Sequence, residues 1–319
     1  MREALFIKKN KDRWLKNQVM PPEDPDEVAT EFTRIVDDLS YAKTFYPHSK
    51  VTRYLNAQAS KIYMGIYQNR KEDRNRITEF WKYEVPLTVR KHHTVMLWVA
   101  CIFIVFFVVG FYSAKNDESF LREMLGDGYV NMTEENIARG KPFGVYADGN
   151  ELLMWIWIML NNIFVAFRYF AEGIFLCFFT IISLVNEGVR LGAFEEMFFA
   201  KGLGLQSVLT VFIHGTLEIS AIIIAGASGV ILGKGWMFPG TGKRIDSFKQ
   251  GAKDSVKILV SLVPIFIVAA FFEGFVTRYY TMPKWLSALI LLSSLSFIVW
   301  YYIIYPILLR SRLQRNNQL

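Results

Sequence analysis

Long apolar runs recur along the chain after residue 92 and predict membrane-spanning helices. A spanning helix needs roughly 17–25 mostly apolar residues. Six runs meet this length, and they cover residues 94–112, 151–167, 172–190, 207–233, 257–277 and 285–308. We therefore expect an all-α polytopic membrane protein with about six transmembrane helices. Residues 191–206 are expected to be interfacial or re-entrant, because their apolar and polar positions alternate in an amphipathic pattern.

The first 92 residues have a different pattern, in which apolar positions recur every three or four residues among many charges. Such spacing places the apolar side chains on one helix face. The clearest stripe comprises Val28, Phe32, Ile35, Leu39 and Ala42. Further helices are expected near residues 2–18 and 49–70, followed by a charged linker at 68–76. The expected domains are thus an N-terminal region of amphipathic helices at 1–92 and a transmembrane domain at 93–319.

Charge is unevenly distributed between the segments outside the predicted spans. Residues 1–92 hold 18 of the 36 Lys and Arg, and the 234–257 loop and the C-terminal tail are also basic. The polar loop at 113–150 instead has seven acidic and four basic residues. Lys and Arg accumulate on the cytoplasmic side of membrane proteins. Six spans with this distribution place both termini in the cytoplasm and the 113–150 loop outside.

The net charge of +7 does not require a nucleic-acid partner. Basic cytoplasmic segments of a multi-pass protein account for it, and the sequence has no DNA- or RNA-binding motif. The two cysteines, Cys101 and Cys177, lie inside apolar runs and have no metal-ligand spacing, so neither a disulfide framework nor a cysteine metal site is expected.

The fourth predicted span carries two ionisable residues, His214 and Glu218, whose spacing of four puts them on one helix face. The fifth carries Glu273 near its outer end. If these spans pack as antiparallel neighbours, the three side chains meet in the outer half of the membrane. Small residues on the same face of the fourth span favour close helix packing, and these are Ala221, Ala225, Gly229 and Gly233. Further candidates for this polar cluster lie in the second and third spans, namely Asn161, Asn162, Asn186 and the adjacent Glu187.

Three interpretations of the polar cluster stay open. A structural polar core, which cross-links helices through hydrogen bonds, is the one we favour. A proton or solute pathway is the second, because intramembrane acids often mark one. A divalent metal or catalytic water site is the third, although the spacing is not the H-E-x-x-H arrangement of zinc peptidases. Without a Ser or Cys nucleophile motif or a phosphate-binding loop, we expect a non-enzymatic protein without a bound cofactor.

Several segments resemble the stage II sporulation protein M family. FIHGTLEISAIIIAGASGVILG at 212–233 resembles its H-G-x-x-E motif and small-residue helix, and FFEGFVT at 271–277 resembles its E-G-F motif. NNIFVAFRYFAEGI at 161–174 resembles its N-N-I segment, and residues 24–63 are similar to the N-terminal region of non-sporulating bacterial members. Asn186-Glu187-Gly188 departs from the pattern, in which Asn directly precedes Gly.

The resemblance implies a multi-pass protein of the bacterial inner membrane. In spore formers the namesake is a membrane anchor for peptidoglycan hydrolases, and other members accompany genes for membrane proteins and MoxR-type ATPases. We therefore hypothesise a scaffold in the bilayer that recruits cell-envelope proteins through residues 113–150 and a cytoplasmic partner through residues 1–92. Assembly into a homo-oligomer stays open. The alternative is a transporter or channel-like protein with His214, Glu218 and Glu273 along its path.

Overall fold

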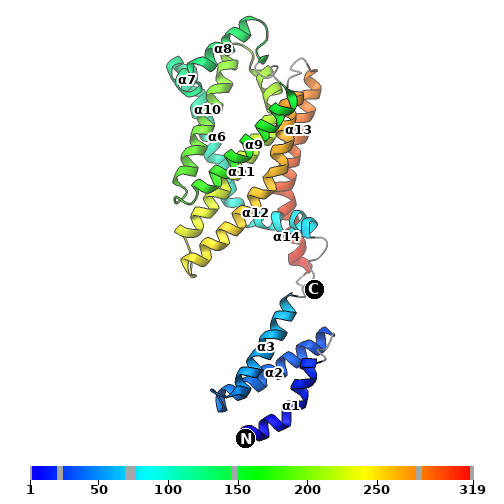
Figure 1. Cartoon of the computed structure of the whole chain (residues 1–319). Coiled ribbons are helices and arrows are strands. Elements are labelled where there is room, and N and C mark those ends of the chain that lie inside the picture. Colours follow the sequence, from blue (N-terminus) through cyan, green and yellow to red (C-terminus); the bar gives the residue numbers. More distant parts are fainter. Residues whose placement is uncertain (1, 20–23, 69–75, 145–149, 278–281, 317–319) are drawn as a thin grey trace. The chain divides into compact units, whose positions relative to one another are not determined.

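The computed structural model describes residues 2–19, 24–68, 76–144, 150–277 and 282–316, and within these ranges it contains helices and no strand (Figure 1). Two compact units form, Met1–Arg76 and Ile77–Leu319. The all-α class expected from the sequence is confirmed. The charged linker expected at 68–76 lies almost entirely outside the described residues.

The first unit is a bundle of three helices, α1 (Glu3–Val19), α2 (Pro25–Phe45) and α3 (Lys50–Gln68). Asp24 caps α2 by accepting a hydrogen bond from the backbone N–H of Asp26, and the Ser49 hydroxyl accepts one from Val51 at the start of α3. The predicted stripe of α2 turns inward, and the buried core consists of Phe6, Trp14, Ile35, Leu39, Ala42, Val51, Leu55 and Ala59.

Side-chain hydrogen bonds also join α1 to α2. The Asp38 carboxylate accepts from the Trp14 indole N–H at 2.8 Å and forms an ion pair with Arg13. One turn further along α1, the Asn17 amide donates to Glu31 at 2.6 Å. A narrow apolar stripe by itself allows each helix to rotate about its axis. These hydrogen bonds restrict that rotation of α1 and α2.

The second unit begins with α4 (Arg76–Glu79), the π-helix η1 (Phe80–Glu84) and α5 (Val85–Lys91). Its long helices follow as α6 (His93–Asn116), α9 (Glu151–Glu172), α10 (Phe178–Ala200), α11 (Gly204–Met237), α12 (Arg244–Phe271) with the π-helix η3 (Phe272–Val276), and α13 (Lys284–Val299) with η4 (Trp300–Ile304) and α14 (Tyr305–Asn316).

Five of the described helices are long and apolar enough to cross a membrane: α6, α9, α11, α12 with η3, and α13 through α14. α10 is 23 residues long, but four ionisable residues interrupt its apolar character, and these are Glu187, Arg190, Glu195 and Glu196. It nevertheless runs along the middle of α6. A Cβ added at Gly192 would lie 2.1 Å from the carbonyl oxygen of Phe107, and one at Gly188 would lie 2.9 Å from that of Phe103. Phe103 therefore faces Gly188, and Phe107 faces Gly192. Since the residue numbers increase in the same direction along both helices, α6 and α10 are parallel.

The amphipathic segment at 191–206 does not form a separate helix or re-entrant loop in the structure. α10 continues through it to Ala200, and α11 begins at Gly204. The amphipathic pattern has another cause, because the apolar side chains of this part of α10 bury against a cap made from the 113–150 loop. This cap contains α7 (Glu118–Leu125) and α8 (Asp127–Ala138), and its core is Ala114, Leu121, Val130, Phe143, Ala193, Met197, Phe198 and Val211.

The boundary between the units falls at residue 76 rather than 92. Residues 77–92 belong with the second unit because their side chains and carbonyls bond to α12 and η4. Lys257 pairs with Glu84 at 2.6 Å, and the Tyr301 hydroxyl donates to the Trp81 carbonyl at 2.8 Å. Amphipathic spacing alone cannot distinguish a helix of a separate bundle from one that packs on the membrane domain.

α11 lies at the centre of the second unit, with α12 and α9 beside it (Figure 1). The small face expected to receive α12 in fact receives α9 and the turn that follows it. A Cβ at Gly229 would lie 2.3 Å from the Tyr169 carbonyl oxygen, and one at Gly233 would lie 2.5 Å from that of Gly173. Ala221 and Ala225 are fully buried on the same helix. α12 also packs closely on α11. A Cβ at Gly251 would lie 3.2 Å from the Ile231 carbonyl oxygen, and the Ser255 hydroxyl donates to the Ser228 carbonyl at 2.7 Å.

Candidate functional site

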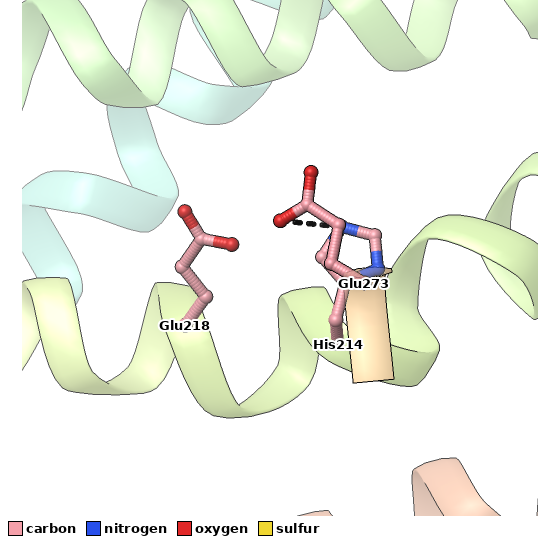
Figure 2. A group of neighbouring side chains, drawn as sticks. All are labelled: His214, Glu218 and Glu273. Carbon is pink, nitrogen blue, oxygen red and sulfur yellow. Dashed lines mark ion pairs between the residues drawn. The ribbon is translucent and has the colours of Figure 1, made fainter. Parts of the chain in front are cut away.

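Two consecutive turns of α11 present His214 and Glu218 on one side of the helix, as Figure 2 shows. His214 is almost completely buried, with 4% of its surface exposed, and Glu218 is half-buried. This is the central helix of the unit, so both side chains face protein rather than the outer surface. Helical periodicity was sufficient to predict that they share a face.

The π-helix η3 supplies the third member, Glu273. Its Oε2 lies 4.0 Å from Nε2 of His214, and one ligand atom from each of His214, Glu218 and Glu273 lies within 4.8 Å of the others (Figure 2). A π-helix contains one extra residue in its turn and rotates the side chains that follow. The structure therefore brings together the three ionisable residues that the sequence singled out on two different spans.

Thr277 orients the imidazole. Its backbone N–H and its hydroxyl both donate to the Phe272 carbonyl, at 2.8 and 3.1 Å. Since the hydroxyl proton is used there, the Thr277 oxygen acts as acceptor for Nδ1 of His214, which lies 3.0 Å away. A neutral His214 then carries its proton on Nδ1 and directs the lone pair of Nε2 toward Glu273.

Asn162 of α9 lies beside the Glu218 carboxylate and is 5% exposed. Its carbonyl oxygen accepts from the Asn161 amide at 3.3 Å, whereas its own amide nitrogen is buried without a hydrogen-bond partner in the described part of the chain. Asn161 is exposed apart from this contact. Of the three candidate asparagines, Asn162 is thus the one that lines the cluster.

Asn186 is exposed on α10, and the adjacent Glu187 instead lies close enough to Glu218 for their charges to interact. The sequence named Asn186 and Glu187 together as candidates, and of the two it is Glu187 that lies near the cluster. Sequence reasoning overlooked Thr277 as a member of the site. Thr277 lies four residues after Glu273, a spacing that places the two side chains on one face in a regular helix, but a threonine at the end of an apolar span is too common to be informative.

A second buried polar group lies nearer the cap, away from these residues. Glu195 of α10 is 2% exposed and accepts a hydrogen bond from the Ser207 hydroxyl at 3.3 Å, while its second oxygen is buried without a partner among the described residues. Ser207, Thr210, His214 and Glu218 follow one another along α11 at spacings of three, four and four residues. These polar positions therefore share one helix face.

The cluster combines one imidazole with two carboxylates, and no Lys or Arg side chain among the described residues pairs with these carboxylates. Two carboxylates this close repel each other when both are ionised, so a shared proton or a cation must accompany them. The arrangement therefore suits a hydrogen-bonded structural core, a proton-exchanging site or a metal site, and Glu218 is central to each.

A family model for stage II sporulation protein M matches residues 99–278, and a second, Domain of unknown function (DUF8413), matches residues 4–68. The chain belongs to the stage II sporulation protein M family. The match extends from within α6 through η3 and includes every member of the cluster. The DUF8413 match covers the three-helix unit. No curated protein and no solved structure matches the chain.

Proposed function

We propose that this member of the stage II sporulation protein M family is a non-enzymatic scaffold of the bacterial inner membrane. The observation that carries the proposal is the presence of two folded regions outside the apolar bundle, the α1–α3 unit and the α7–α8 cap. The α1–α3 unit has its own buried core, the cap shares one with the ends of α6, α10 and α11, and each region exposes charged side chains. The bundle itself then serves to hold these two regions at the membrane.

The cap offers a rigid, acidic surface for a protein partner. Phe143 stacks on Phe198 at 5.1 Å, which fastens the end of the cap to α10. Lys201 pairs with Glu134 at 2.9 Å, and this hydrogen bond outweighs partial burial to lower the pKa of Glu134. Exposed carboxylates remain around this anchored core, including Glu118 and Asp127 at 74% and 77% side-chain exposure. A cationic surface of a cell-envelope protein would complement it.

The three-helix unit offers a second surface, a polar cleft of about 730 Å³ between α1 and α2. Residues of both charges line it, among them Lys16, Asp26 and Arg34. Such a cleft suits a polar segment of a cytoplasmic protein better than an apolar ligand. We assign the unit to the cytoplasm because its region is rich in Lys and Arg.

The orientation follows if α10 counts as a sixth crossing. Its parallel alignment with the middle of α6 supports this, since a helix beside the centre of an apolar span lies at membrane depth. Six crossings place both termini on one side and the cap on the other. The basic 234–257 segment then faces the cytoplasm together with the termini.

Site-specific photo-crosslinking in cells tests the scaffold proposal. A photoreactive amino acid replaces Met132 on the cap or Thr30 in the cleft, both away from the packed cores. Discrete protein adducts are expected from both positions. Leu160, which is 57% exposed on α9 within an apolar span, is the control and should yield lipid adducts. Absence of protein adducts from the cap and from the cleft would overturn the proposal.

A transport function is the second candidate, because polar positions on α11 form one face from Ser207 through Thr210 and His214 to Glu218, with Glu195 beside Ser207. Intramembrane acids of this kind mark proton pathways in transporters. Vesicles containing the purified protein and an internal pH dye would show Glu218-dependent proton flux. Equal flux from the Glu218→Gln variant, or none from the parent protein, would reject this candidate.

A further inference from the structure

The strongest cluster of potential ligand atoms in the described ranges combines His214 and Glu218 of α11 with Glu273 of η3 (Figure 2). We propose that these three side chains bind one divalent transition-metal ion, with zinc the best match, and that the ion joins α11 to the end of α12. This goes beyond the scaffold function and does not depend on it.

The type and number of ligand atoms favour zinc over the alkaline-earth ions. Zinc takes His nitrogen and carboxylate oxygen in four-coordinate sites, and three protein ligands leave the fourth position for water. Calcium takes six to eight oxygen ligands, and magnesium prefers oxygen in an octahedral shell. A single imidazole with two carboxylates suits zinc, manganese or iron instead.

The distances need only a small adjustment. Tetrahedral ligands with bonds of about 2.0–2.1 Å lie about 3.3 Å from each other. The observed separation of His214 Nε2 from Glu273 Oε2 is 4.0 Å, and the three ligand atoms lie within 4.8 Å. Rotation of the two glutamate side chains, each of which has several torsions, closes this difference without moving the helices.

The surroundings of the three side chains provide independent support. A metal-bound histidine usually donates its other ring N–H to an oxygen, which fixes the tautomer. Thr277 accepts that hydrogen bond from Nδ1 here, because its own proton goes to the Phe272 carbonyl. The lone pair of Nε2 consequently points toward Glu273, as ligation requires.

Asn162 is the second independent observation. Its amide nitrogen is buried beside Glu218 and has no hydrogen-bond partner within the described part of the chain. An amide N–H at this place can donate to the outer oxygen of a metal-bound carboxylate or to a metal-bound water. A buried donor without a partner destabilises the protein, so a polar occupant of the site would be favoured.

The charge balance also favours a cation. Glu218 and Glu273 carry two negative charges when ionised, and Glu187 adds a third nearby. A divalent ion compensates the two ligating carboxylates inside an apolar bundle, where an isolated charge is costly. Binding requires both carboxylates to be deprotonated, so it releases any proton that they hold in the metal-free protein.

The test measures metal bound to the full-length protein purified in detergent. Protein stripped with a chelator is dialysed against zinc chloride or manganese chloride and analysed by mass spectrometry for metal per chain. We expect close to one equivalent of zinc. The Glu218→Gln variant, which keeps side-chain shape and removes one ligand charge, should lose at least as much zinc affinity as loss of an outer-shell partner costs, which is about 10–100-fold.

Two further variants separate ligand loss from misfolding. Glu195→Gln removes a buried carboxylate of the same unit outside the cluster and should keep the full equivalent. Thr277→Val removes the hydrogen bond to Nδ1 and should weaken zinc binding by about 10–100-fold while leaving three ligands. Zinc should raise the melting temperature of the parent protein and of Glu195→Gln, but not that of Glu218→Gln.

Cobalt substitution gives a readout of the ligands themselves, because the visible spectrum of bound Co²⁺ reports its coordination geometry. The parent protein should show the intense absorption of a four- or five-coordinate site, and Glu218→Gln should lose it. The proposal is overturned if the parent protein, shown to be folded, binds neither zinc nor manganese at micromolar concentration. Equal binding by the parent and Glu218→Gln would overturn it as well.

Discussion

At the residue scale, two glycines determine how closely helices of the second unit approach one another, and one threonine orients a buried side chain. Gly229 lets the Tyr169 carbonyl of α9 lie against α11, and Gly192 does the same for Phe107 of α6 on α10. Thr277 has a different effect, because its hydrogen bonds select the tautomer of His214. None of these residues is unusual in an apolar span, so their importance depends on what faces them.

Gly229→Ala should destabilise the protein by about 1–3 kcal/mol, because the added methyl group would lie 2.3 Å from the Tyr169 oxygen and 2.8 Å from the Thr180 hydroxyl. Differential scanning fluorimetry in detergent measures the resulting fall in melting temperature. Gly215→Ala on the same helix is the control. Its methyl group would meet only side chains at 3.6 Å or more, so the variant should equal or slightly exceed the parent in stability.

Glu31 makes the stability of the three-helix unit depend on pH. Partial burial raises the pKa of this carboxyl, but hydrogen bonds from Asn17 and Arg34 outweigh burial and lower it below its ordinary value of 4.5. A carboxyl with a lowered pKa in the folded state stabilises that state above pH 4.5. This contribution is lost as the pH falls through the folded-state value.

We therefore expect protection of α1–α3 from hydrogen exchange in the full-length protein to fall as the pH is lowered below 4.5, after correction for intrinsic exchange rates. Glu31→Gln should show less of this pH dependence. Glu27→Gln, at an exposed position of the same helix, should behave like the parent. Identical pH profiles for Glu31→Gln and the parent would contradict the assignment.

At the element scale, the π-helices η1, η3 and η4 change the direction in which the following side chains point, compared with a continuous α-helix. η1 precedes Pro86 and η4 precedes Pro306, and proline cannot donate the N–H that a regular turn needs. The two segments meet, since the Tyr305 hydroxyl donates to the Lys82 carbonyl at 2.9 Å. η3 has no proline within it, and the bond from Thr277 N–H to the Phe272 carbonyl defines its wide turn.

The cap formed by α7 and α8 depends on a few apolar contacts with α10. Phe198→Ala should loosen it by about 3–5 kcal/mol, since Phe198 is 2% exposed and stacks on the equally buried Phe143. Limited proteolysis from the cap side measures the effect as faster cleavage within residues 113–144. Met132→Ala, an exposed position on α8, should be cleaved at the parent rate. Unchanged cleavage of Phe198→Ala would show that the stack does not hold the cap.

At the scale of the whole molecule, the number of crossings determines which side each extramembrane region faces. Five helices qualify by length and apolar character, and α10 lies parallel to one of them despite its charges. Three of its four charged side chains face protein and not the outer surface of the helix bundle. Glu195 and Glu196 are buried, and Glu187 lies near enough to Glu218 for their charges to interact, whereas Arg190 is exposed. The hydropathy of a segment is lowered by such charges, but it does not show whether those side chains contact other parts of the protein.

Cysteine labelling measures the topology directly. After Cys101 and Cys177 are replaced by serine, single cysteines at the exposed positions Lys8, Glu123, Lys249 and Arg312 report both ends and both sides. A membrane-impermeant maleimide applied to spheroplasts should label only Glu123→Cys, and the other three should react after permeabilisation. Labelling of Arg312→Cys without Lys8→Cys in intact spheroplasts would indicate an odd number of crossings.

Much of this architecture could be predicted because it depends on local periodicity. The apolar stripe that includes Ile35, Leu39 and Ala42 predicted an inward helix face, and the spacing of His214 and Glu218 predicted a shared one. The position of Glu273 followed from antiparallel neighbours of known length. The partner of Gly229 and the length of α10 could not be predicted, because each depends on which surface the helix meets.

The sequence by itself determined that this chain is an all-α membrane protein with ionisable residues inside an apolar span. Periods of 3.6 residues and runs of about 20 apolar residues are properties of a single segment, so no neighbour is needed to read them. Tertiary structure decided which helix packs on the glycines of α11, that residues 77–92 join the second unit, and that Thr277 and Asn162 surround the three ionisable side chains. These depend on contacts between segments far apart in the chain, and the free energy of those contacts is a property of both partners.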